Sequence, residues 1–474
     1  MFRVFRHHVS VTAFTGMMAD MVLLFAALVL AGTTLAGGTP AGGGHTGEPL
    51  EPAQMALFAA HFALVISLMY SFAGLYRPTP IGIPTLWGRT VVAMLAGGYV
   101  TYLTLGLVMQ AEYLKLLISS ALLYALVGLV FVRAGLYGLK RVRARQRVLI
   151  VGTGPEAYAV AGDLRALTRA SNNVIGFYPG SDEVPAHSAA VSGPHAGPPV
   201  FSRETSIEEL VQRHRIDQII VAEREQRGGG VPMDQLLACR IRGIPVIDLA
   251  GFYERAKSEV PIDSLKASWL VYGHGFAQGT VQRLVKRTFD ILCSGVLLIL
   301  TSPVMLLAVL AIRLDSPGPI IYRQERVGKG GRGFMCLKFR SMRLDAERDG
   351  VARWAAKNDS RVTRVGAFIR KTRIDELPQL VSVLKGQMSL VGPRPERPSF
   401  VAQLREQIPF YDVRHSVKPG VTGWAQVRYS YGSTLEDARR KHQFDLYYVK
   451  NNSLFLDILV LIETVSVVLF REGQ

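Results

Sequence analysis

Long runs of apolar residues fill the first third of the chain, whereas the middle and the end mix apolar and polar positions as globular proteins do. Each of four runs approaches the ~20 residues that an α-helix needs to cross a lipid bilayer. Charged residues fall mainly between these runs. The pattern predicts a four-helix transmembrane bundle over residues 1–140, with spans at 14–36, 55–75, 88–109 and 114–134.

Positive charge is distributed unequally over the connections of this bundle. Basic residues precede the first run, lie between the second and the third, and crowd the segment 140–147, whereas the other two connections are nearly bare of them. The positive-inside rule then places both ends of the bundle in the cytoplasm. Asp20 is an isolated acid near the start of the first run. An intramembrane acid is a functional candidate, but exposure at the interface explains Asp20 equally well, so its role stays open.

After the bundle, short apolar strands alternate with helices. The stretch RVLIVGTGPEAYAVAGDL has the pattern of a strand, a glycine turn and a helix, and Gly152, Gly154 and Ala157 match the G-x-G-x-x-A form of the dinucleotide fingerprint. We therefore predict a Rossmann-like α/β domain over 146–250. The second strand does not end in the acid that holds a ribose, and no Tyr-x-x-x-Lys pair follows. These two absences favour a Rossmann-like domain with no redox role over a cofactor site.

A fifth apolar segment, 289–314, is also long enough to cross a bilayer. Basic residues bracket it, and Ser302 and Pro303 stand at its middle. Proline removes a backbone donor and disfavours helical geometry in the preceding residue. The alternatives are a kinked transmembrane helix and a re-entrant helix that breaks at Ser302–Pro303 and turns back within one leaflet. We favour the re-entrant helix, because it keeps both basic flanks in the cytoplasm.

Composition narrows the classes of partner. The 474 residues include 54 Lys and Arg against 37 Asp and Glu, a formal net charge of +17. The bases belong to no helix-turn-helix, zinc-finger or RNA-binding signature, so we expect no nucleic-acid partner. Many of them flank apolar segments, where inner-membrane lipids present anionic headgroups. The three cysteines lack CxxC spacing and indicate neither a disulfide framework nor a zinc site.

The last third of the chain carries dense patches of charge, of which 364–396 is the most informative. Apolar residues from Leu377 onward follow helical spacing. Proline is tolerated in the first turn of a helix, so Pro378 marks its start. The pattern therefore predicts a helix whose N-terminus carries Asp375 and Glu376.

An Asp-Glu pair alone is no signal, and its neighbours give it meaning. Arg370, Lys371 and Arg373 lie immediately upstream of Asp375 and Glu376. Two acids among three bases at a helix start suit a magnesium ion and a diphosphate. One carboxylate can hold the metal while the other attacks phosphorus.

Several motifs follow one another in order across this region. They are KRTFDI, the Ser-Pro pair, SPGPIIYRQERVG, KFRSM, RIDELPQL, SLVGPRPE, KPGVTGWAQV and FDLYYVKN. In these motifs, residues 283–471 resemble the bacterial sugar transferase family, the monotopic polyprenyl-phosphate phosphoglycosyl transferases. The preceding spans and Rossmann-like domain resemble the large members of that family. The resemblance implies a monotopic α/β catalytic domain over 283–474 with a re-entrant membrane helix, joined through a linker at 251–282.

The resemblance also implies a reaction. Asp375 would attack the β-phosphorus of a UDP-sugar, release UMP and carry the phosphosugar until undecaprenyl phosphate accepts it, and Glu376 would bind Mg²⁺. The resemblance implies that this reaction is the initiating step of exopolysaccharide, capsule or O-antigen assembly. It also implies that the reaction takes place on the cytoplasmic face of the inner membrane and that the protein forms a homodimer.

Further site residues follow from the matching positions. Lys338, Arg370, Arg394 and Asp445 are candidates for substrate phosphate contacts and active-site support, because arginine forks clamp phosphate through two hydrogen bonds. Gln426 is a candidate near the nucleotide. The chain departs from the family pattern after WAQV, where Arg428 begins RYSYG in place of Asn-Gly-Arg, and this departure concerns the sugar or base contact.

Two other functions remain as alternatives. One is a nucleotide-sensing regulatory membrane protein with a degenerate transferase domain. The other is a sugar-nucleotide dehydratase or epimerase, which the missing Tyr-x-x-x-Lys pair disfavours. Turnover of UDP-sugars that depends on Asp375 distinguishes the transferase from both.

Overall fold

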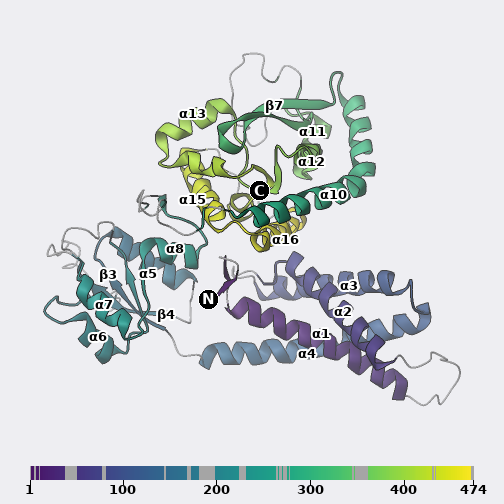
Figure 1. Cartoon of the computed structure of the whole chain (residues 1–474). Coiled ribbons are helices and arrows are strands. Elements are labelled where there is room, and N and C mark those ends of the chain that lie inside the picture. The colour runs from purple at the N-terminus through teal and green to yellow at the C-terminus, as the bar shows by residue number, and fades with distance from the viewer. Residues whose placement is uncertain are drawn as a thin grey trace. The chain divides into compact units, whose positions relative to one another are not determined.

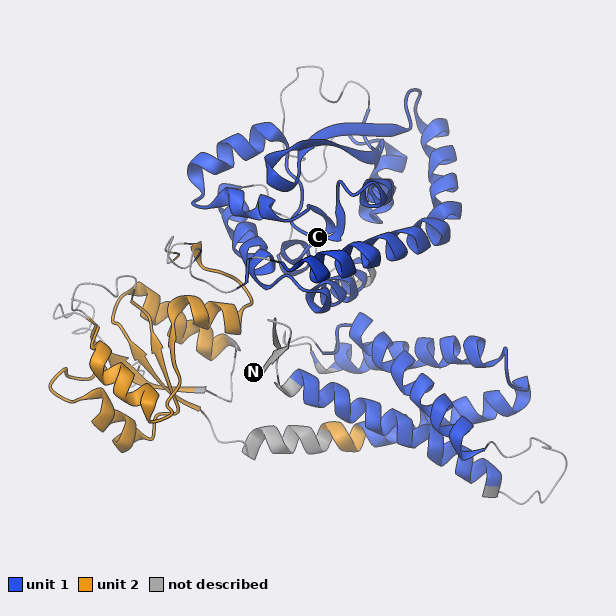
Figure 2. Ribbon diagram, in the orientation of Figure 1, with its two compact units in different colours: residues 1–129, 267–474 blue, residues 130–266 orange. Residues whose placement is uncertain are grey.

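The computed structural model forms two compact units (Figure 2). Unit 1 consists of residues 1–129 and 267–474, and unit 2 consists of residues 130–266. The residues that the structure describes are 2–4, 7–9, 11–37, 51–76, 82–142, 146–167, 172–180, 198–223, 231–262, 265, 270, 275–276, 278–343, 346, 361–429, 432 and 434–470.

Four helices follow a short antiparallel hairpin at the N-terminus of unit 1 (Figure 1). Their shared core contains fully buried alanines, Ala31, Ala59 and Ala121, beside large side chains such as Phe62 and Leu117. Small residues allow helix backbones to approach closely where lipid surrounds them. The elements are β1 Phe2–Val4, β2 His7–Val9, α1 Val11–Gly37, α2 Pro52–Phe72, α3 Ile83–Leu105 and α4 Ala111–Val142.

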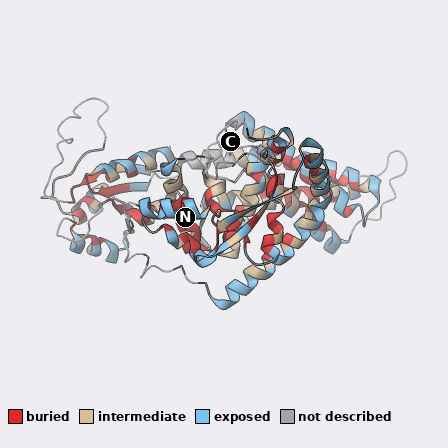
Figure 3. Cartoon of the chain, turned by 90° about the horizontal axis from the view of Figure 1, so that it is seen from above, coloured by how far each residue is buried: buried red, intermediate tan, exposed pale blue. Residues whose placement is uncertain are grey.

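Within the described residues, four helices are long and apolar enough to cross a membrane, namely α1, α2, α4 and the later α10 (Thr280–Asp315). Three of the four predicted N-terminal spans are thereby confirmed as apolar helices. The third, α3, is helical over 23 residues, but its polar positions keep it out of this set. Figure 3 shows exposed residues beside buried ones along the helices of the chain. The exposed residues of α1, α2 and α4 include large apolar side chains such as Val22, Leu57 and Phe131, as expected of surfaces that face lipid.

Asp20 has a defined partner inside the bundle. Its side chain is buried, and the Tyr76 hydroxyl donates a hydrogen bond of 3.1 Å to Oδ2 of Asp20. The alternative of interfacial exposure is therefore wrong for this conformation. The hydrogen bond satisfies a polar group that would be costly to leave unpaired among apolar helices.

Unit 2 is built on a four-stranded parallel sheet in the order β4-β3-β5-β6. Helices α5 and α8 cover one face and α6 and α7 the other, so the strands are buried on both sides. The predicted alternation of strands and helices is confirmed, and the name Rossmann-like stays a prediction. The elements are β3 Gln146–Val151, α5 Pro155–Leu167, β4 Asn172–Tyr178, α6 Ile207–His214, β5 Gln218–Val221, α7 Met233–Ile241, β6 Val246–Asp248 and α8 Leu249–Ala256, which runs into the segment 251–282 expected as a linker.

The glycine turn after β3 faces a carboxylate of its own chain. A Cβ on Gly152 would lie 3.1 Å from Oε1 of Glu223, and the Thr153 backbone N–H donates a hydrogen bond to the same carboxylate. Burial and the charge of Glu156 raise the pKa of Glu223. The phosphates of a dinucleotide would bind to backbone N–H groups of this turn. The Glu223 carboxylate therefore lies where such a phosphate would bind.

The apolar segment 289–314 lies within a single helix, α10. Pro303 stands inside this helix, and Figure 1 shows a marked bend along it. The proline cannot donate to the Ile299 carbonyl, and the Ser302 hydroxyl donates to that oxygen instead at 2.7 Å. The serine hydroxyl thus satisfies the carbonyl that the proline leaves without a partner. Helical structure continues through Ser302 and Pro303, and a return of α10 within one leaflet at this pair stays a prediction.

The rest of unit 1 is an α/β assembly of short elements after α10. A two-stranded antiparallel ribbon, β7–β8, and a two-stranded parallel pair, β9–β10, frame the segment that carries Asp375. The elements are β7 Ile321–Val327, η3 Lys329–Gly331, β8 Gly333–Phe339, α11 Arg364–Lys371, η4 Ile374–Glu376, α12 Gln379–Leu384, β9 Ser389–Val391, α13 Pro398–Gln407, η5 Tyr411–Ser416, β10 Gly420–Thr422, α14 Trp424–Arg428, α15 Leu435–Asn451 and α16 Leu454–Phe470.

Candidate active site

Asp375 and Glu376 lie in the single 3-10 turn η4, directly before α12. Arg373 precedes the turn with φ at 61°, a left-handed conformation that is uncommon for a residue with a side chain. The predicted helix itself begins only at Gln379, so Asp375 and Glu376 precede it in a turn of their own. Pro378 is the N-cap of α12 and contributes no backbone donor.

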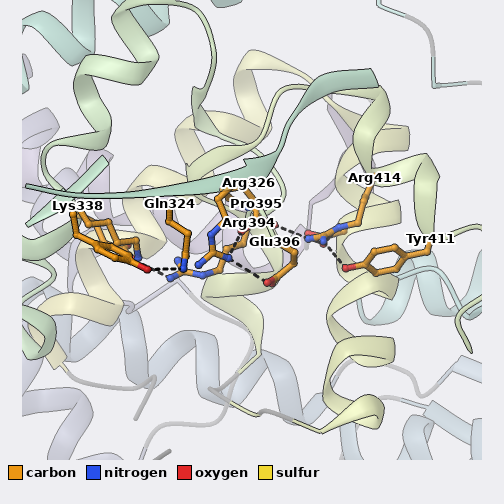
Figure 4. A network of polar contacts seen from close by, with 11 residues as sticks. Gln324, Arg326, Lys338, Arg394, Pro395, Glu396, Tyr411 and Arg414 are labelled. Carbon is orange, nitrogen blue, oxygen red and sulfur yellow. Dashed lines mark hydrogen bonds and ion pairs between the residues drawn. The ribbon is translucent and has the colours of Figure 1, made fainter. Parts of the chain in front are cut away.

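Glu376 is held by two cations that come from distant parts of the sequence. Lys338 Nζ on β8 and Arg394 NH2 after β9 each lie 2.8 Å from Oε1 of Glu376 (Figure 4). The Glu376 side chain is 9% exposed, so solvent screens these pairs weakly. Burial disfavours its charge, but Arg394 and Lys338 outweigh that effect and hold the pKa of Glu376 well below its usual range.

The pKa of Asp375, the residue next to Glu376, is shifted in the opposite direction. It is buried, and its Oδ1 has no hydrogen-bond partner among the described residues. Burial raises the pKa of Asp375 and the charge of Glu376 raises it further, while Lys338 and Arg394 oppose both effects. A carboxylate oxygen without a hydrogen bond is more nucleophilic than a fully solvated one, and it is also open to a metal ion.

Arg394 is itself positioned through its backbone. The carbonyl oxygen of Arg394 accepts a 2.9 Å hydrogen bond from NH2 of Arg414. Arg414 also donates to Oδ2 of Asp445 at 2.8 Å and to the Tyr411 hydroxyl at 2.7 Å (Figure 4). Asp445 is 2% exposed. It binds Arg414, which in turn binds the Arg394 carbonyl, so its position fits the predicted role in active-site support better than a contact with substrate phosphate.

A second arginine fixes the other side of the same loop. Arg326, on β7, donates to the Pro395 carbonyl at 3.0 Å and lies 3.5 Å from Oε2 of Glu396. The Val327 N–H donates to the Glu396 carbonyl at 2.9 Å. The β7–β8 ribbon thus holds the loop after β9 with backbone bonds as well as with charge.

Two predicted residues have no described contact with the pair. Arg370 is half-buried at the end of α11, and the charge that reaches Asp375 and Glu376 from this segment comes from Arg373. Gln426 lies on α14, and its amide donates at 3.5 Å to the Val421 carbonyl. Substrate contacts by Arg370 and Gln426 stay predictions.

The carboxylates of Asp375 and Glu376 could hold a magnesium ion only if substrate phosphates supplied further ligands. Among the described residues, no three His, Cys, Asp or Glu side chains come close enough to hold a metal. Mg²⁺ commonly takes one or two carboxylates and completes its shell with water and substrate phosphates. Asp375 and Glu376 meet that requirement, and the remaining oxygen of Glu376 carries neither of its two ion pairs.

The chain is similar to known proteins over most of its length. The family model described as bacterial sugar transferase matches residues 281–471. A UDP-glucose:undecaprenyl-phosphate glucose-1-phosphate transferase of Xanthomonas campestris pv. campestris is 31% identical over 358 residues, which cover 72% of this chain and 71% of that protein. The exopolysaccharide production protein PSS of Rhizobium leguminosarum bv. phaseoli is 44% identical over 188 residues, which cover 38% of this chain and 94% of that protein.

The chain belongs to the bacterial sugar transferase family. A further relative, the UDP-N-acetylgalactosamine-undecaprenyl-phosphate N-acetylgalactosaminephosphotransferase of Aeromonas hydrophila, is 43% identical over 259 residues, or 55% of this chain. The chain covers 60% of that relative's length. The membership and the predicted resemblance agree.

Within this bacterial sugar transferase, one departure from the family pattern has a structural account. Arg428 pairs with Glu463 of α16 at 2.6 Å, and its guanidinium lies 4.3 Å from the ring centroid of Trp424. These contacts anchor the end of α14. The sequence analysis did not single out Arg414, whose only signal was its place shortly before the motif KPGVTGWAQV.

Proposed function

We propose that this protein transfers a sugar-1-phosphate from a UDP-sugar to undecaprenyl phosphate, as the initiating step of exopolysaccharide, capsule or O-antigen assembly. The observation that carries the proposal is the buried pair in which Glu376 is neutralised by Lys338 and Arg394 while Asp375 keeps an oxygen without a hydrogen bond. The names of the relatives, which specify UDP-sugars and undecaprenyl phosphate, support it.

The reaction then has two displacements at one phosphorus. An oxygen of the Asp375 carboxylate attacks the β-phosphorus, and the bond to the bridging oxygen breaks, so UMP leaves with the electron pair. In the second step an oxygen of undecaprenyl phosphate attacks the same phosphorus. Asp375 leaves as a carboxylate, and the sugar is now joined to the lipid through a diphosphate. No proton is required by either bond exchange, which suits a nucleophile that is already ionised.

Lys338 and Arg394 have two successive roles in this scheme. Before the substrate binds, they compensate the buried charge of Glu376. When a diphosphate arrives, the same donors are placed to share its charge and to stabilise the charge that develops on the departing UMP. Arg414 and Arg326 keep the loop of Arg394 in place during the exchange.

Magnesium would be held by Glu376, with Asp375 adjacent, and it would supply Lewis-acid stabilisation of the diphosphate. Its requirement is tested by chelation of the purified protein, followed by restoration with Mg²⁺. The residues themselves bind, orient and exchange the phosphosugar.

We further propose that the catalytic region lies on the cytoplasmic face of the inner membrane, with α10 re-entrant. Exposed leucines and valines line the apolar part of this helix, and basic residues bracket it. This placement gives the site access to a nucleotide-sugar from the cytoplasm and to a lipid from the bilayer. Unit 2 is then a Rossmann-like domain without a redox role, and a homodimer remains a prediction of the resemblance.

The test is turnover by purified protein with a panel of UDP-sugars, Mg²⁺ and undecaprenyl phosphate. We expect release of UMP and formation of a lipid-linked sugar with at least one donor. Asp375→Asn should abolish both, and Asp412→Asn, which removes an exposed acid paired with Arg405, should abolish neither. If no donor gives UMP, the regulatory alternative is favoured. Equal rates for Asp375→Asn and the unchanged protein would exclude Asp375 as the nucleophile.

A further inference from the structure

The first turns of α10 carry charged residues that face the catalytic elements. Lys286 and Arg287 precede the apolar segment 289–314, and Asp290 lies at its start. Each makes hydrogen bonds to segments about 100 residues later in the chain. Arg283, one turn earlier, is exposed and bonds only locally to Thr280 in the described structure.

Arg287 holds the end of the helix that follows the catalytic pair. Its NH1 donates to the Val383 carbonyl at 2.6 Å and its NH2 to the Leu384 carbonyl at 2.7 Å. The last carbonyls of a helix lack partners within the helix and carry partial negative charge. A cation with two donors satisfies both needs, so Arg287 ties α12, and with it the turn of Asp375, to α10.

Asp290 and Lys286 hold the strand that leads to Arg394. Oδ1 of the buried Asp290 accepts 3.1 Å hydrogen bonds from the Ser389 hydroxyl and from the Leu390 N–H. Lys286 Nζ lies 2.6 Å from the fully buried Asp457 and 3.3 Å from the Val391 carbonyl. Strand β9 is therefore bonded to α10 at each of its three residues.

We infer that Arg287, Asp290 and Lys286 are positioning residues that set the distance between Asp375 and Arg394 from the base of the membrane helix. Asp375 lies on the segment that Arg287 holds, and Arg394 lies on the segment that Asp290 and Lys286 hold. One rigid helix thus serves as the common frame for the nucleophile and for the cation that compensates its neighbour. The inference rests on the proposed function and adds a mechanical link between the membrane helix and the reaction.

The contacts predict which kinetic constant changes. None of the three residues contacts the pair in the described structure, so UDP-sugar binding should be largely kept. A displacement of the reacting groups by about 1 Å costs roughly 100-fold in rate. Arg287→Ala and Asp290→Ala should therefore lower kcat by roughly 10- to 100-fold while KM for the UDP-sugar changes less than about threefold.

The experiment measures kcat, KM and the thermal unfolding temperature of full-length protein in lipid nanodiscs. Arg283→Ala is the matched control, because it removes an exposed arginine that lies one turn earlier in α10 and bonds only to Thr280 among the described residues. Asp290→Asn keeps an oxygen that accepts both hydrogen bonds, so it should recover most of the rate lost in Asp290→Ala. A purely structural role would lower the unfolding temperature and the fraction of active protein, but it would leave kcat per active site unchanged in Asp290→Ala.

The results separate this inference from the proposed function. If the unchanged protein turns over and Arg287→Ala and Asp290→Ala match Arg283→Ala in kcat, the positioning role is overturned and the transferase function stands. A loss confined to KM would also overturn it. If the unchanged protein gives no turnover with any donor, it is the proposed function that fails.

Discussion

At the residue scale, two adjacent carboxyl groups are driven in opposite directions by their surroundings. Glu376 shares two cations and has a depressed pKa, whereas burial and the charge of Glu376 raise the pKa of Asp375. A nucleophile must be ionised, so the acid limb of the pH profile of kcat/KM should report Asp375.

The first prediction concerns Lys338. This cation opposes the raised pKa of Asp375, so Lys338→Met should raise that pKa further. Activity is present above the pKa and lost as pH falls through it, and the acid limb should therefore move to higher pH, with a loss of roughly 100-fold in kcat/KM at neutral pH. Lys115→Met, at an exposed pair with Glu112, is the control. An unmoved acid limb would contradict the electrostatic assignment.

The second prediction separates stability from position at Asp445. Removing one partner of a buried ion pair leaves an uncompensated charge, so Asp445→Ala should lower the free energy of unfolding by about 3–5 kcal/mol. Replacing both partners, as in Asp445→Leu with Arg414→Met, should restore much of that stability. It should not restore kcat, because the Arg394 carbonyl loses its donor.

Chemical denaturation and steady-state rates measured on the same samples test this pair of variants. Recovery of full activity in the double variant would mean that Arg414 stabilises the fold without positioning Arg394.

At the scale of elements, the pattern of apolar residues predicted which segments are helices but did not predict where the helices begin and end. Runs of the right length predicted α1, α2 and α4, and strand-helix alternation predicted the parallel sheet. The start of α12 was missed because Pro378 fits both a first turn and an N-cap. The effect of the Ser302–Pro303 pair on α10 was left between two alternatives, because the sequence does not show that the Ser302 hydroxyl bonds the carbonyl that Pro303 cannot.

The third prediction concerns the topology of α10. In a protein whose three native cysteines are replaced, Asp315→Cys should resist a membrane-impermeant thiol reagent in intact cells and react in inverted vesicles, since both flanks of a re-entrant helix are cytoplasmic. Adding Pro303→Ala should straighten the helix and shift part of the population toward periplasmic labelling. Periplasmic labelling without the proline change would contradict the re-entrant arrangement.

At the scale of the whole molecule, the site depends on contacts that no local pattern contains. Lys338, Glu376 and Arg394 meet from three separate segments. Their motifs could be found in the sequence, because charged residues there are interleaved with glycine and proline. Arg414 and Arg287 could not be assigned, because the contacts through which they position the site are to backbone carbonyls, which every residue carries.

A long apolar helix is bonded directly to the proposed phosphosugar-transfer site. Helix α10 bonds to the segments that carry Asp375 and Arg394. The central claim remains the chemical one, that the phosphosugar is carried on Asp375 between donor and acceptor.

The most direct measurement is a single turnover without acceptor, read by mass spectrometry. The protein is incubated with a UDP-sugar and Mg²⁺, quenched and digested, and UMP is measured in parallel. We predict one UMP per active site and a phosphosugar adduct on the peptide that contains Asp375, which undecaprenyl phosphate then removes. UMP that appears only after undecaprenyl phosphate is added, with no adduct at any time, would contradict the covalent mechanism.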